Sequence, residues 1–146
     1  MNIKTYESAS DYLGTKESRP LPGRSTRLMR MSDICIVVRY HSTNVVSYYK
    51  SGEIVLDTGG WWTVTTKARL NEYAPVRVSQ RDGEWFVRIG SRDSFYPLPP
   101  ETYQYVDGMR MSERLPYSNA RIHRVGNWFI QGTPDNDIRL AEGVRA

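Results

Sequence analysis

Hydrophobic and polar residues alternate, or gather in short apolar runs, along most of the chain after residue 26. The clearest run covers residues 34–40 and is rich in β-branched side chains, which is typical of a strand covered on both faces. The other segments alternate or are shorter, as expected for half-buried strands. The expected strands are residues 34–40, 45–49, 53–57, 76–80, 84–89, 93–98, 103–106, 121–125 and 128–131.

Short turn sequences join several of these segments into expected β-hairpins. Gly52 lies between the second and third segments, and Asp82-Gly83 between the fourth and fifth. Asp-Gly is a strong hairpin signal because both residues accept a left-handed backbone. Gly126-Asn127 is a third turn of this kind, and it would pair His123 near Ile130 as a packed histidine rather than a catalytic base.

One segment changes from the strand period to the period of a helix. Residues 65–74 place Thr66, Leu70 and Tyr73 on one side of a helix that begins at a threonine cap and ends at Pro75. The expected fold class is therefore α+β, with a mainly antiparallel β-sheet, hairpins and one packed helix at about residues 65–74.

The distribution of proline, glycine and polar residues predicts three parts. Residues 1–25 are expected to form an N-terminal arm, because its one or two helical turns at residues 8–13 precede Pro20, Pro22 and Gly23. Residues 26–132 are expected to form a single β-rich domain. Residues 133–146 are expected to be a C-terminal tail.

Composition excludes several classes of protein. The 146 residues, 39% of them hydrophobic, suit one domain, and no apolar run approaches the ~18 residues of a membrane span. The polar start of the chain lacks the apolar core of a secretion signal, so we expect a cytoplasmic protein without membrane contact. One cysteine and two histidines argue against a disulfide framework and a structural zinc site, and we expect no metal and no cofactor.

Positive charge is modest and uneven. Twenty Lys and Arg against sixteen Asp and Glu give a net charge of +4. Arg24, Arg27 and Arg30 lie close together along the chain, and they would support contacts to nucleic acid. An ordinary basic surface is the alternative reading of the same residues.

The entry to the expected helix combines several groups that bind anions. Gly59 and Gly60 allow a close approach of the backbone, and the hydroxyls of Thr63 and Thr65 stand near the unpaired amides of a helix start. Lys67 and Arg69 follow within the helix. A tight corner with a capping threonine is the purely structural interpretation of this segment.

His41 follows the apolar strand and is separated from Thr43 by one residue. His-x-Thr is half of the motif of the two-histidine phosphoesterases, but no Ser or Thr stands two residues after His123. A catalytic interpretation would use His41 as the general base, with Lys67 stabilising phosphoryl charge. No complete motif of a hydrolase, a metal-dependent nuclease or a phosphate-binding loop is present.

A longer pattern resembles a known family. It consists of Tyr40-His41-Ser42-Thr43 with Val45-Val46, then Leu56-Asp57-Thr58-Gly59-Gly60-Trp61, then Thr63-Val64-Thr65-Thr66-Lys67-Ala68-Arg69. These residues resemble a family of small, functionally uncharacterised proteins from bacteriophages and bacterial mobile elements, over about residues 26–111. The resemblance implies action inside a bacterial host, and it brings no catalytic residues to transfer.

Together these features favour a non-enzymatic accessory protein of a phage or mobile element. Its expected partner is an anionic ligand, either nucleic acid or a nucleotide, or a host or defence macromolecule. The expected ligand-binding residues are His41, Thr43, Gly59, Gly60, Thr63, Thr65, Lys67 and Arg69. Two alternatives remain open, a metal-independent nuclease or phosphoesterase that uses His41, and a virion or host-inhibitor scaffold.

Overall fold

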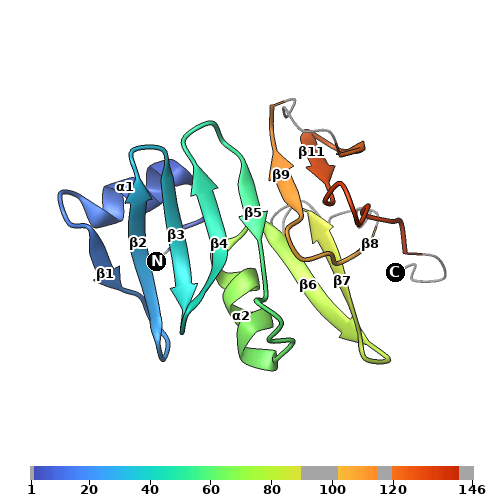
Figure 1. Cartoon of the computed structure of the whole chain (residues 1–146), viewed down its shortest axis with the longest axis horizontal. Coiled ribbons are helices and arrows are strands. Elements are labelled where there is room, and N and C mark those ends of the chain that lie inside the picture. Colours follow the sequence, from blue (N-terminus) through green and yellow to red (C-terminus); the bar gives the residue numbers. More distant parts are fainter. Residues whose placement is uncertain (1, 90–101, 115–119, 142–146) are drawn as a thin grey trace.

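Two antiparallel sheets and two helices form the described part of the chain (Figure 1). The structure is a computed structural model that describes residues 2–89, 102–114 and 120–141. The larger sheet has eight strands in the order β1-β2-β3-β4-β5-β9-β11-β10, and the smaller has three in the order β6-β7-β8. In chain order the elements are α1 (Tyr6–Leu13), β1 (Ser18–Pro20), β2 (Thr26–Ser32), β3 (Cys35–Tyr40), β4 (Thr43–Tyr49), β5 (Ile54–Leu56), α2 (Val64–Tyr73), β6 (Val76–Arg81), β7 (Glu84–Ile89), β8 (Tyr103–Gln104), β9 (Arg110–Ser112), β10 (Ile122–Val125) and β11 (Trp128–Gln131).

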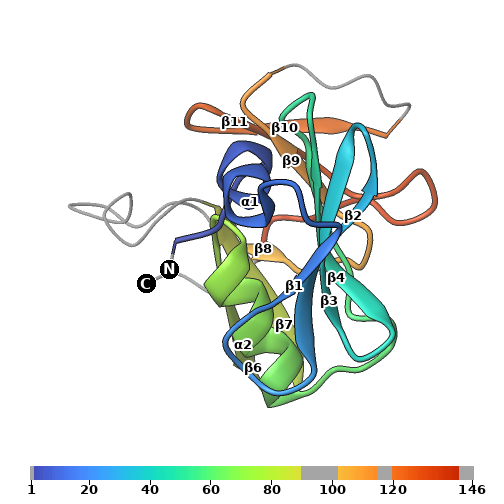
Figure 2. The same ribbon diagram turned by 90° about the vertical axis from the view of Figure 1, so that its left-hand side faces the viewer.

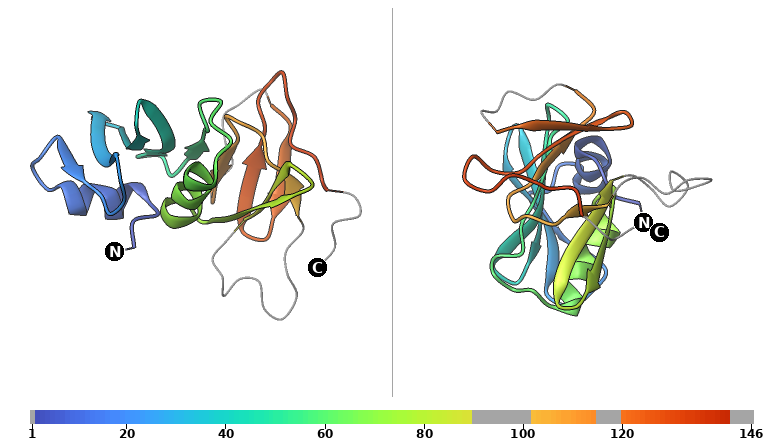
Figure 3. Two further views of the ribbon diagram at one scale, coloured as in Figure 1. Left: turned by 90° about the horizontal axis from the view of Figure 1, so that it is seen from below. Right: turned by 90° about the vertical axis from the view of Figure 1, so that its right-hand side faces the viewer.

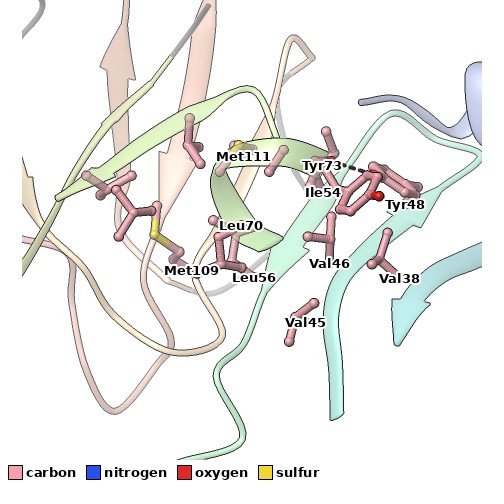
Figure 4. Close-up of a cluster of buried hydrophobic side chains, with 14 of the residues drawn as sticks. Val38, Val45, Val46, Tyr48, Ile54, Leu56, Leu70, Tyr73, Met109 and Met111 are labelled. Carbon is pink, nitrogen blue, oxygen red and sulfur yellow. Dashed lines mark hydrogen bonds between the residues drawn. The ribbon is translucent and has the colours of Figure 1, made fainter. Parts of the chain in front are cut away.

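Both helices lie on one face of the large sheet (Figure 2). The small sheet lies on the same side, next to α2 (Figure 3). Between these layers is the core, in which Val46, Leu56, Leu70 and Met109 are fully buried (Figure 4). The expected α+β class with a mainly antiparallel sheet is confirmed.

Helix α2 has the expected threonine cap and ends before Pro75, and both of its ends lie one residue earlier than the sequence predicts. The Thr63 hydroxyl accepts the amide hydrogen of Thr66 and caps the first turn. Leu70 and Tyr73 are buried on the side that faces the sheet, as the helical period indicated. Neither of the two helices in the described residues is long and apolar enough to cross a bilayer.

The three expected hairpins form with the predicted turns. Strands β4 and β5 pair across Gly52, and β6 and β7 pair across Asp82-Gly83. In the third hairpin His123 stands opposite Ile130 and contacts the Asp137 carboxylate at 3.1 Å. The expected strand at residues 93–98 lies outside the described residues.

The segment expected to be an N-terminal arm packs against the rest of the fold. Helix α1 contacts β2, β3 and β4, and β1 pairs with β2. Ile3 and Leu13 are almost completely buried in the common core. The hydrophobic pattern of residues 1–25 did not predict this packing, because the apolar residues are few and are brought together only by folding.

Residues 133–141, expected as the start of a tail, also fold back onto the sheets. Ile138 is fully buried, and the Arg139 carbonyl accepts a hydrogen bond from the amide of Gln104. The Ala141 amide donates to the Thr102 carbonyl. The tail expectation rested on Pro134 and its polar neighbours, which form a turn rather than an unpacked end.

Candidate functional site

A cavity of about 410 Å³ opens between the β3–β4 turn and the loop that leads into α2. This volume is within the range of small-molecule sites. It brings together residues separated by more than a dozen positions in the sequence. The cavity is lined by Tyr40, His41, Ser42, Thr43, Thr58, Trp61, Thr63 and Thr66, and we call it the His41 pocket.

The β3–β4 turn and the residues that flank it form one wall of the His41 pocket. His41 occupies the first position of the two-residue turn with a φ of 54°, and its amide donates to the Ser25 carbonyl. Its ring centroid lies 4.4 Å from that of Tyr40. Within the described part of the chain, the polar side-chain groups of Tyr40, His41, Ser42 and Thr43 have no hydrogen-bond partner.

The loop before α2 and the first turn of that helix form the opposite wall, where the threonine hydroxyls are hydrogen-bonded and one aromatic ring is exposed. The Thr63 hydroxyl donates to the Thr66 hydroxyl at 3.0 Å while it caps α2. The Thr58 hydroxyl donates to Asp107 at 2.7 Å and accepts the amide of Gly60. Trp61 is 64% exposed, so a large part of its ring surface is available to a ligand.

Asp107 holds the loop of residues 57–63 in place. Its carboxylate accepts hydrogen bonds from the Thr58 amide, the Thr58 hydroxyl and the Tyr105 hydroxyl, at 2.8, 2.7 and 3.0 Å. Burial, followed by the nearby Asp107 charge, raises the pKa of Tyr105 well above its ordinary value, which keeps this phenol as a donor. The loop wall of the pocket is therefore anchored to the segment before β9.

The glycine corner is not the anion cradle that the sequence suggested. The Gly59 amide donates to the Asp57 carboxylate at 2.8 Å, and the Gly60 amide donates to the Thr58 hydroxyl. These side-chain turns engage both donors, as Asp and Thr commonly do. Gly59 serves packing instead, because a Cβ there would lie 2.5 Å from the Thr43 hydroxyl.

Neither of the two cations of α2 lines the His41 pocket, and the two side chains contact different parts of the fold. Lys67 Nζ bonds to Gln80 and stands 5.6 Å from the Trp85 ring centroid. Arg69 Nε bonds to Thr26, and its guanidinium lies 5.6 Å from the Tyr40 ring centroid. Thr65 is exposed and does not line the cavity. The catalytic pairing of His41 with Lys67 is thus not assembled here.

The three arginines expected to support nucleic-acid binding occupy different places. Arg24 is exposed in the loop before β2, and Arg27 is exposed on β2 itself. Arg30 donates to the Gly14 carbonyl at 3.1 Å, at the C-terminal end of α1. A cation at this position complements the helix dipole, so the visible role of Arg30 is structural.

Sequence reasoning thus found three lining residues, His41, Thr43 and Thr63, but missed the remaining five. Tyr40 and Ser42 flank His41 and could have been added as turn neighbours. The burial of Thr58 and the position of Trp61 depend on tertiary contacts. Within the described residues, no group of three or more His, Cys, Asp and Glu is placed to hold a metal ion.

The fold and the pocket define a small α+β protein with a hydroxyl- and aromatic-lined cavity at one end of its main sheet. The family model described as "Kyanoviridae Gp96 protein" matches residues 15–112, about two thirds of the chain. The chain belongs to this phage protein family, and the expected phage origin is confirmed. No curated protein and no solved structure matches it.

Proposed function

We propose that this phage protein is a non-enzymatic binding protein that takes a nucleobase-containing ligand in the His41 pocket. It would act in the cytoplasm of the infected bacterium, where nucleotides and nucleic acids are abundant. The observation that carries the proposal is that one cavity combines exposed ring surface with polar groups that no described residue hydrogen-bonds.

The rings of the pocket suit a flat ligand. Trp61 lies on one wall, and Tyr40 and His41 lie on the other. A nucleobase has π-faces that stack on such rings, with a typical contribution of roughly 1–3 kcal/mol per base. Stacking would supply affinity with little dependence on which base is bound.

The polar groups of the pocket suit the edge of a base. Imidazole and hydroxyl groups both donate and accept hydrogen bonds, so His41, Ser42 and Thr43 can match the mixed donors and acceptors of a base edge. No carboxylate is among the described residues that line the cavity. A neutral or anionic ligand is therefore favoured over a cationic one.

The proposal is tested by titrating AMP, GMP, CMP and UMP into the full chain and following ligand signals by NMR. We expect saturable binding of at least one mononucleotide, and at least a tenfold loss of affinity in Trp61→Ala and in His41→Asn. Asparagine tolerates a positive φ, so the second variant removes the imidazole without straining the turn.

Asp82→Asn is the matched control, because Asp82 has a φ of 53° in another hairpin turn and does not line the pocket. This variant should bind as the native chain does. The proposal fails if none of the four mononucleotides binds, or if Trp61→Ala and His41→Asn both bind with the affinity of the native chain.

A further inference from the structure

The face of the large sheet opposite the helices presents two arginines side by side. On β2, buried Thr26 and Leu28 face the core, and Arg27 between them therefore points to the other side. On β3, Val38 is a core residue and Arg39 follows it. No helix in the described residues covers this face (Figure 2).

Arg27 and Arg39 are direct cross-strand partners. Like charges placed opposite each other destabilise a sheet, unless a counter-charge lies between them. Neither guanidinium has a carboxylate within ion-pair distance in the part of the chain that the structure describes. An isolated pair of this kind is suited to an anion from outside the chain.

Neutral contacts orient both guanidinium groups. Arg27 Nε donates to the Ser18 hydroxyl at 2.9 Å, and Arg39 Nε donates to the Asn44 side-chain oxygen at 2.9 Å. These bonds orient the two side chains through Nε. Among the described residues, the terminal nitrogens of Arg27 have no hydrogen-bond partner, and those of Arg39 have only a 4.0 Å contact to the Met31 sulfur. A guanidinium with free terminal nitrogens can form forked hydrogen bonds to a phosphate.

We propose that Arg27 and Arg39 bind the phosphates of a single-stranded nucleic acid. Arg39 is two residues before His41, and Tyr40 between them faces α2, so the arginine pair and the His41 pocket lie near the same end of the large sheet but on opposite sides of it. A strand held by its phosphates at the arginine pair would pass around this end of the sheet to place one unstacked base in that pocket. The choice of a single strand over a duplex rests on the proposed function, whereas the phosphate contact does not.

The test measures binding of fluorescein-labelled single-stranded oligonucleotides, oligo(dA) and oligo(dT) of twelve nucleotides, to the full chain by anisotropy across a salt series. Arg27→Gln/Arg39→Gln should lower affinity at least tenfold at low salt. It should also reduce the slope of log affinity against log salt by about 1.4, the value for two phosphate contacts to a single strand. Arg77→Gln/Arg81→Gln removes two exposed arginines from the other sheet and is the control.

Equal losses in the two double variants would overturn the proposal, because they would reflect net charge alone. Absence of oligonucleotide binding by the native chain would overturn it as well. Mononucleotide binding by Arg27→Gln/Arg39→Gln should match that of the native chain, which separates this surface from the pocket. A twelve-base-pair duplex that binds as tightly as the single strands would contradict the single-strand assignment.

Discussion

At the scale of single residues, His41 has a side chain at a position where the backbone conformation favours glycine. Among the described residues, only Ser25, His41 and Asp82 combine a side chain with a positive φ. A left-handed backbone costs an L-residue roughly 1–2 kcal/mol, and glycine avoids this cost. The imidazole at the pocket therefore occupies a turn position for which glycine is the better fit.

Replacing His41 with glycine separates a ligand-binding role from a structural one. We expect the free energy of unfolding to change by less than about 1 kcal/mol, because relief of strain offsets the added freedom of the unfolded chain. Asp82→Gly is the companion variant, with the same type of φ. Urea unfolding of both proteins is the measurement, and a loss above about 2 kcal/mol in His41→Gly alone would mark the imidazole as a packing group.

At the scale of elements, the ends of α2 are fixed by different parts of the chain. Thr63 caps the start locally. At the other end, Lys4 Nζ donates to the Asn71 and Ala74 carbonyls at 3.1 and 3.0 Å, and the Tyr48 hydroxyl donates to the Tyr73 carbonyl (Figure 4). These donors satisfy carbonyls that a helix end leaves unpaired, and the ammonium also complements the helix dipole.

Lys4→Met should lower the free energy of unfolding by about 1–2 kcal/mol, because it removes two charge-assisted hydrogen bonds. The Asn71 and Ala74 carbonyls would then lose the donor that Lys4 provides. Hydrogen exchange should become faster at the last turn of α2 and remain unchanged in the β6–β7 hairpin. Lys50→Met, at an exposed turn position, is the control and should stay within about 0.5 kcal/mol of the native chain. Equal effects of the two variants would contradict the capping role.

At the scale of the whole molecule, buried phenols link the layers together. Tyr48 reaches from the large sheet to the end of α2, and Tyr73 donates from α2 to the Pro22 carbonyl at 3.2 Å. Burial raises the pKa of Tyr73 to about 12, with a further contribution from the Glu72 charge. Burial also raises the pKa of Tyr48 and of Tyr105 above the ordinary value of 10.0.

This pattern predicts a loss of stability at alkaline pH. A phenol whose pKa is higher in the folded state than in the unfolded chain contributes stability that is complete below pH 10 and is lost as the pH rises toward 12. The free energy of unfolding should therefore fall steadily above pH 10, and phenolate absorbance from Tyr48 and Tyr105 should appear only together with unfolding. A pH-independent free energy of unfolding from pH 9 to 12 would contradict this linkage.

The spacing of Lys67 and Arg69 in the sequence already predicts that the two side chains do not share one side of the helix. Lys67 and Arg69 are two residues apart, and residues two apart in an α-helix project about 200° from each other. They could not converge on one ligand once residues 65–74 were taken as a helix. The structure places them accordingly, on Trp85 and on Tyr40.

By itself the sequence determined the features that depend on near neighbours. The hairpin turns, the period of α2 and its capping by a threonine follow from local backbone preference and from side chains a few residues apart. Only the tertiary structure decided that residues before 26 complete the core, and that the β3–β4 turn and the loop before α2 enclose one cavity. Those contacts join positions far apart in the chain, and their energy comes from burial and anchoring groups such as Asp107 that no local pattern specifies.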